Sequence, residues 1–162
     1  FEIIRRVSHY FNNKIEFFIS DYIEQDLQYE LKYLSKEIIV HTPGHLKWSE
    51  NIGVLNMSAL MVSPTLIENF SNAFVEAFAL AKPVITFDVG GNKEIVDDGL
   101  NGYVVPYLDV DHLISKTCIL LSDQNKLGSF SIEAKNKASK LCNIEALQNQ
   151  YADMFNKVLL ND

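Results

Sequence analysis

Short apolar runs alternate with segments of helical spacing along most of this 162-residue chain. The clearest strand run, residues 83–88, is rich in β-branched side chains and follows an apolar helical segment. Other strands are predicted at residues 15–20, 38–44, 60–64 and 103–106. Helices are predicted at residues 3–11, 21–36, 49–60, 70–81, 90–96, 109–121 and 129–160, the last with a break near Cys142 and Asn143. This order predicts an α/β fold, a Rossmann-like doubly wound parallel sheet in one domain with a helical C-terminal tail.

Composition excludes several classes of function. Apolar residues make up 48% and charged residues 22%, which is typical of a soluble globular domain. The net charge is −7 and no cluster of lysine and arginine is present, which argues against a nucleic-acid surface. The apolar runs are too short to span a bilayer, and we expect no signal peptide. Cys118 and Cys142 lack CxxC spacing, so reduced thiols in a cytoplasmic protein are expected.

Two carboxylates lie on either side of a predicted loop-to-helix junction. Glu68 is in the loop after strand 60–64, and Glu76 lies one or two turns into the next helix. The backbone amides near Ser71, Asn72 and Ala73 would then face an anion with the positive end of the helix dipole. We expect these amides to hold phosphates and the acids to accept hydrogen bonds from sugar hydroxyls. The alternative is that both acids are ordinary surface residues.

The residues around these acids form a recognisable pattern. Glu68, Phe70, Asn72, Glu76 and Ala77 fit a Glu-x7-Glu signature, and matching blocks follow at residues 82–85, 88–91, 94–96 and 98–106. Together they resemble the C-terminal, donor-binding domain of group 1 (family 4) retaining glycosyltransferases, which have the GT-B fold.

The resemblance implies roles for individual residues. Glu68 would be catalytic, contacting the donor sugar and stabilising charge during transfer, and Glu76 would bind the ribose hydroxyls. The donor-binding segment would also include Phe70, Ser71, Asn72 and Ala73. The loop of Gly44, His45 and Leu46 matches the place where the family receives the nucleotide base.

Several positions depart from the family pattern. Asn69 replaces a common glycine, Leu80-Ala81 replaces Cys-Gly, and Ser20-Asp21 stands where Gly-Asp-Gly is usual. The strand, Gly-Arg turn and Lys-Gly pair that precede the first helix in the family have no match. We therefore expect residues 1–162 to be a donor domain that is incomplete at its N-terminal end, with the N-terminal acceptor domain absent, and inactive alone.

The resemblance also implies a reaction and a setting. A nucleotide-diphosphate sugar would donate its glycosyl group, with retention, to a saccharide or lipid-linked acceptor in bacterial polysaccharide biosynthesis. The intact hexosyltransferase would be cytoplasmic or peripheral at the inner membrane face. Two alternatives stay open: a related GT-B epimerase or phosphorylase, and a non-catalytic nucleotide-binding module.

No metal or other cofactor is expected. The sequence Asp109-Val-Asp111 spells the Asp-x-Asp of metal-dependent glycosyltransferases, but Asp109 immediately precedes a helical segment, where an N-cap explains it. The pair Gly90-Gly91 lacks a phosphate-loop pattern, and a tight strand-to-helix turn explains it.

The expected burial of apolar side chains can also be tested. We predict that six aromatic residues line the core or a groove: Phe17, Phe18, Tyr22, Tyr29, Tyr33 and Trp48. The last helix carries an apolar stripe with helical spacing, which we expect to be partly exposed.

Overall fold

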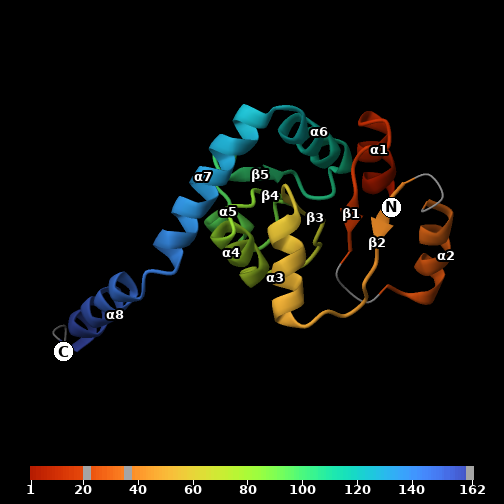
Figure 1. Ribbon diagram of the computed structural model, residues 1–162. Coiled ribbons are helices and arrows are strands. Elements are labelled where there is room, and N and C mark those ends of the chain that lie inside the picture. The colour runs from red at the N-terminus through yellow and green to blue at the C-terminus, as the bar shows by residue number, and fades with distance from the viewer. Residues whose placement is uncertain (20–22, 35–37, 160–162) are drawn as a thin grey trace.

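The computed structural model describes residues 1–19, 23–34 and 38–159 (Figure 1). Its helices are α1 (Glu2–Tyr10), α2 (Gln25–Leu34), α3 (Trp48–Met57), α4 (Asn72–Ala79), α5 (Asn92–Ile95), α6 (Val110–Ser122), α7 (Gln124–Leu141) and α8 (Ile144–Leu159). Its strands are β1 (Phe17–Phe18), β2 (Val40–His41), β3 (Met61–Ser63), β4 (Val84–Phe87) and β5 (Gly102–Val105). Strands and helices therefore alternate from β1 to α6, as the sequence predicts.

The strands form two parallel sheets. One has the order β3-β4-β5, and the other consists of β1 and β2. Because every pair is parallel, the loops that follow β3, β4 and β5 leave the same edge of their sheet. That edge is where open α/β sheets bind ligands.

The central strand β4 is covered on both faces. Val84 packs with Phe74 and Phe78 of α4 and with alanines of α7. The next residue, Ile85, belongs to a separate cluster with Leu113 and Leu120 of α6. Side chains alternate between the faces of a strand, so these two clusters lie on opposite sides of the sheet. The α/β, Rossmann-like doubly wound fold class is confirmed.

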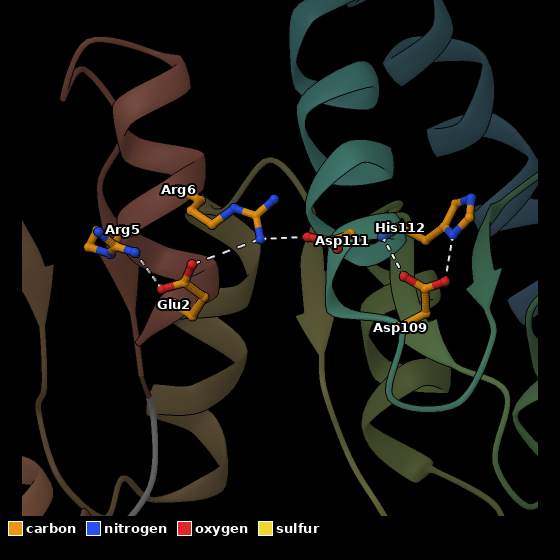
Figure 2. Close-up of polar contacts among 6 residues, drawn as sticks. All are labelled: Glu2, Arg5, Arg6, Asp109, Asp111 and His112. Carbon is orange, nitrogen blue, oxygen red and sulfur yellow. Dashed lines mark hydrogen bonds and ion pairs between the residues drawn. The ribbon is translucent and has the colours of Figure 1, made fainter.

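Helix α1 packs against α6, with Val7 buried beside Ile114 and Cys118. At the edge of this contact the guanidinium of Arg6 lies 2.6 Å from the carboxylate of Asp111 (Figure 2). Both side chains are partly exposed, so this ion pair contributes little stability beyond the apolar contact. The packing fixes the N-terminal segment to the larger sheet.

Several predicted boundaries were wrong. The first two strands hold two residues each, and α4 begins at Asn72 rather than at residue 70. Helix α3 begins at Trp48, one residue before the predicted start at residue 49, because the Lys47 amide donates to the Glu50 carboxylate at 2.8 Å. The predicted ends of the second helix, at residues 21–22 and 35–36, lie outside the described residues.

The C-terminal tail is helical, and its break after α7 is confirmed. Asp123 caps α7 by accepting a hydrogen bond from the Lys126 amide at 3.0 Å, so this helix begins five residues before the predicted start at residue 129. Asn143 accepts from the Ala146 amide at 3.0 Å and starts α8. Figure 1 shows α8 extending away from the rest of the chain, and no residue of α8 is buried. Among the described residues, no helix is long and apolar enough to cross a membrane.

The aromatic side chains of the N-terminal third are less buried than expected. Trp48, Tyr29 and Tyr33 are all largely exposed, and Phe18 lies near the surface stacked on His41. Only Phe17 packs beside a core cluster, the one formed by α1 and α6. Tyr22 lies outside the described residues. The core half of the prediction was therefore wrong for Phe18, Tyr29, Tyr33 and Trp48, and the alternative, that they line a groove, stays a prediction.

Candidate functional site

Glu68 lies in the loop between β3 and α4, at the carboxyl edge of the larger sheet. The side chain is half-buried, and its Oε1 accepts a hydrogen bond from the Asn69 amide at 3.0 Å. Among the described residues, no lysine, arginine or histidine forms an ion pair with Glu68. The carboxylate therefore keeps acceptor capacity at the edge of the sheet.

The turn after β4 lies in close contact with the loop that carries Glu68. A Cβ at Gly90 would overlap the carbonyl oxygen of Glu68, and one at Gly91 would overlap that of Asn69. The Gly91 amide also donates to the Asn69 carbonyl at 2.7 Å. Gly90 adopts a φ of 52°, in the left-handed region. The glycine pair thus serves close contact between two loops as well as the predicted tight turn.

Asn92 holds this turn in place through hydrogen bonds to β4. Its side chain is fully buried, and its Nδ2 donates to the Thr86 hydroxyl and to the Phe87 carbonyl, both at 3.0 Å. These bonds tie the start of α5 to the end of β4. The positions of Gly90 and Gly91 are therefore set by the sheet, and they in turn set the position of the Glu68 backbone.

The N-terminus of α4 presents unpaired backbone donors. Ser71 is the N-cap and is buried, whereas Phe70 just before it is exposed. In the described part of the chain, no protein acceptor pairs with the backbone amides of Ser71, Asn72 and Ala73. Free amides at a helix start attract anions. These amides lie on the segment that joins Glu68 to Glu76.

Glu76 lies in the second turn of α4 and contacts Trp48. The indole Nε1 donates to Oε1 of Glu76 at 2.8 Å, which joins the start of α3 to α4. Among the described residues, the Glu76 side chain makes no other hydrogen bond. No cationic side chain of these residues lies at ion-pair distance from the Glu76 carboxylate. The second carboxylate oxygen, Oε2, has no hydrogen-bond partner among the described residues, so it keeps its acceptor capacity.

The predicted base-binding loop is close to this contact along the chain. Gly44 follows β2 with a φ of 77°, His45 is exposed and Leu46 is half-buried. Leu46 is two residues before Trp48, and two residues span at most about 7 Å. Since Trp48 contacts Glu76, in the middle of α4, this loop is connected to that contact through two residues of chain.

Asp109 caps a helix, as predicted. It accepts hydrogen bonds from the His112 amide at 3.0 Å and from His112 Nδ1 at 2.7 Å (Figure 2). These two hydrogen bonds lower the pKa of the Asp109 carboxyl. Asp111 pairs instead with Arg6. Among the residues that the structure describes, no three His, Cys, Asp or Glu side chains are grouped to hold a metal ion.

The comparison with protein families decides the class. Residues 6–123 match the family described as "Glycosyl transferases group 1", which covers more than half of the chain. The chain belongs to the group 1 glycosyltransferases. The matched residues include the whole candidate site, from Gly44 to Asn92.

Individual relatives agree with this membership. Over 144 residues, 84% of the chain, it is 25% identical to the UDP-Gal:alpha-D-GlcNAc-diphosphoundecaprenol alpha-1,3-galactosyltransferase of Escherichia coli. It covers 36% of that protein, so the chain spans about a third of its relative's length.

Solved structures share the fold. Staphylococcus aureus TarM, crystallised as a mutant with fondaparinux, alpha-GlcNAc-glycerol and UDP, aligns with a TM-score of 0.77 and 17% identity over 96% of this chain and 31% of TarM. The C-terminal domain of a glycosyl transferase group 1 family protein from Francisella tularensis aligns with a TM-score of 0.68 and 18% identity, covering 86% of this chain and 77% of that domain.

Sequence reasoning about this group 1 family chain missed two site residues. Trp48 was expected in the core or a groove, yet its indole contacts Glu76 from 28 positions away. Asn92 carried no signal, because an asparagine after two glycines is ordinary turn sequence. A sign for Trp48 was available, since this single tryptophan follows the predicted base loop.

Proposed function

We propose that this chain is the donor-binding domain of a retaining group 1 glycosyltransferase. It binds a nucleotide-diphosphate sugar along the carboxyl edge of its larger sheet. The glycosyl group passes, with retention, to a saccharide or lipid-linked acceptor. The intact protein is a hexosyltransferase-type enzyme, and residues 1–162 form an incomplete donor domain of it.

The observation that carries the proposal is the set of unpaired amides at the start of α4, with a carboxylate on each side. A diphosphate can accept hydrogen bonds from the amides of Ser71, Asn72 and Ala73, where the helix dipole also favours negative charge. Glu68 and Glu76 would repel phosphate oxygens, but both can accept from sugar hydroxyls. The order acid, amides, acid therefore suits a ligand that is sugar, diphosphate and ribose in sequence.

Glu68 is the proposed catalytic residue. Its partly desolvated carboxylate stabilises the positive charge that develops at the sugar ring as the bond to the diphosphate breaks. Glu76 accepts from the ribose hydroxyls, and the base lies by the loop of Gly44, His45 and Leu46. The exposed ring of Phe70 borders the same segment. No metal ion is required in this scheme, because the helix N-terminus stabilises the leaving diphosphate.

Related proteins support a uridine nucleotide. The name of the E. coli relative contains a UDP-sugar, and the TarM structure holds UDP. Relatives also include a capsular polysaccharide biosynthesis glycosyltransferase of S. aureus, 27% identical over 111 residues, 68% of this chain and 29% of that protein. We propose a bacterial setting of this kind, with the enzyme cytoplasmic or peripheral at the inner membrane face. The acceptor would bind to an N-terminal domain outside this chain, and residues 1–162 alone would show no turnover.

A thermal-shift screen tests donor binding. The chain is heated with UDP, GDP, ADP or a sugar conjugate of each, because a ligand that binds only the folded state raises the melting temperature. A shift with one nucleotide family supports a donor site and names the base. No shift with any nucleotide, in a chain that unfolds cooperatively, contradicts a working donor site in these residues.

A further inference from the structure

Trp48 is placed unusually for the single tryptophan of a chain. Its side chain is 68% exposed, so little apolar surface is buried by holding it there. Its polar atom is nevertheless engaged, since the indole N–H donates to Glu76 at 2.8 Å. The geometry of this side chain is therefore explained by the hydrogen bond better than by packing.

The bond restricts Glu76. A glutamate side chain on a helix surface samples several rotamers, and fixing it costs conformational entropy. The indole N–H holds Oε1 in one position and leaves Oε2 as an acceptor. A tryptophan has few rotatable bonds, so it restrains a partner at low entropic cost.

The chemical type of the hydrogen-bond donor to Glu76 also matters. The indole is neutral, so it orients the carboxylate without cancelling its charge. A lysine or arginine in the same place would form an ion pair and compete with a neutral ligand for the carboxylate. Hydroxyl groups are neutral donors, and a carboxylate that keeps its charge is a strong acceptor for them.

We propose that Trp48 is a positioning residue for the ribose of the bound nucleotide. It acts through Glu76, which it holds ready to accept hydrogen bonds from the ribose hydroxyls. The proposal rests on the proposed function, because it takes Glu76 as the ribose ligand. It adds that discrimination between a ribonucleotide and a nucleotide without ribose hydroxyls depends on a residue of α3.

The test compares two ligands in two proteins. Titration calorimetry measures binding of UDP and of 2′,3′-dideoxyuridine 5′-diphosphate to the wild-type chain and to Trp48→Phe, which keeps an aromatic ring and removes the N–H. We expect Trp48→Phe to weaken UDP binding about tenfold, as expected for losing a hydrogen bond to a charged group that binds the ligand. Binding of the dideoxy analogue is expected to change less than twofold, roughly the limit for an untouched contact.

A mutant cycle separates positioning from a structural effect. In a Glu76→Ala background, Trp48→Phe should cause no further loss of UDP affinity, since its route to the ligand is gone. Tyr151→Phe on α8 is the matched control, because it alters an exposed aromatic residue outside the site. The fluorescence emission of Trp48 should also change in Glu76→Gln, because the charged partner of the indole N–H is lost. It should stay unchanged in Glu145→Gln.

The outcomes are distinguishable. If the folded wild-type chain binds none of UDP, GDP and ADP, the proposed function fails and Trp48 has no ribose to position. If UDP binds but Trp48→Phe weakens both ligands equally, or neither, the donor site stands and the role of Trp48 is wrong.

Discussion

The carbonyl oxygen of Glu68 occupies the space that a Cβ of residue 90 would need. The loop that carries the proposed catalytic acid is therefore shaped by a glycine on a different loop, 22 residues further along the chain. Gly90 also adopts a left-handed φ of 52°, which disfavours any side chain.

Replacing Gly90 with alanine should displace the Glu68 loop. We expect Gly90→Ala to lower the free energy of unfolding by about 2–4 kcal/mol, from backbone strain together with the overlap. Urea unfolding measures this value. Gly99→Ala is the matched control, because Gly99 has a φ of 75° but open space around it, and it should cost only about 1 kcal/mol. Equal losses of unfolding free energy in Gly90→Ala and Gly99→Ala would show that the overlap with the Glu68 carbonyl has no effect on stability.

The two acids should differ in what they bind. Glu76→Ala is expected to weaken UDP about tenfold or more, because a charge-assisted hydrogen bond to the ribose is lost. Glu68→Ala should leave UDP binding unchanged and weaken only the sugar conjugate. Calorimetry with UDP and UDP-glucose measures both effects, with Glu145→Ala on the exposed helix α8 as control. A loss of UDP affinity in Glu68→Ala would reverse the assignment of the two roles.

Helix α4 ends with an alanine in a glycine position. Ala81 has a φ of 58°, and the amides of Ala81 and Lys82 donate to the carbonyls of Phe78 and Ala77 at 2.9 and 2.8 Å. This is a Schellman motif, in which glycine is favoured. Ala81→Gly should therefore raise the free energy of unfolding by about 1 kcal/mol, measured by urea unfolding.

The matched control for this change is Ala79→Gly in the last turn of the same helix. Ala79 is exposed and helical, so the glycine should destabilise by about 0.5–1 kcal/mol. Destabilisation by Ala81→Gly would mean that the alanine methyl group contributes packing that outweighs its strain.

The two cysteines should react at different rates. Cys142 is exposed, whereas Cys118 is buried between α1 and α6. Burial raises the pKa of the Cys118 thiol, although nearby Arg6 acts in the opposite direction. A thiol reagent at pH 8 should therefore modify one group rapidly, and Cys142→Ser should abolish that phase. A second rapid thiol in the native protein would contradict the burial of Cys118.

The same shift predicts a pH dependence. Above about pH 8.5 an ordinary thiol ionises, so the unfolded chain releases a proton that folded Cys118 retains. Ionisation thus favours the unfolded state, and this contribution to stability should fall as pH rises through that range. Cys118→Ala should flatten the fall, which urea unfolding at pH 7 and pH 9.5 would measure.

The larger sheet and the segment from Glu68 to Glu76 were predictable because their signals are local. Residues 83–88 are rich in β-branched side chains, and residues 84–87 of this run form β4, in which every residue is buried. Asp109 precedes a helical pattern and caps α6. The resemblance supplied the motif, and residues 6–123 do match the family.

Non-local contacts were not predictable. The overlap between Gly90 and Glu68, and the bond between Trp48 and Glu76, each join different elements, and no periodicity records such pairing. Short apolar runs overstated the first two strands, since Ile15 and Ile19 flank β1 rather than extend it. Side-chain burial in this region depends on what packs there, so aromatic residues such as Trp48 were misjudged.

The small sheet of β1 and β2 has a consequence for local opening. Each strand holds two residues, and the amides of Phe17 and Ile19 donate to Ile39 and His41, both at 3.0 Å. Because this two-stranded sheet is so short, it lacks independent stability. We therefore expect β1 and β2 to separate at a free-energy cost well below that of global unfolding. Hydrogen exchange should therefore be fast at Phe17 and Ile19 and slow in β4. Gly44, His45 and Leu46 follow β2, so a nucleotide that binds to this loop should stabilise the paired form of the two strands. The increase in hydrogen-exchange protection at β2 on nucleotide binding would measure that stabilisation directly.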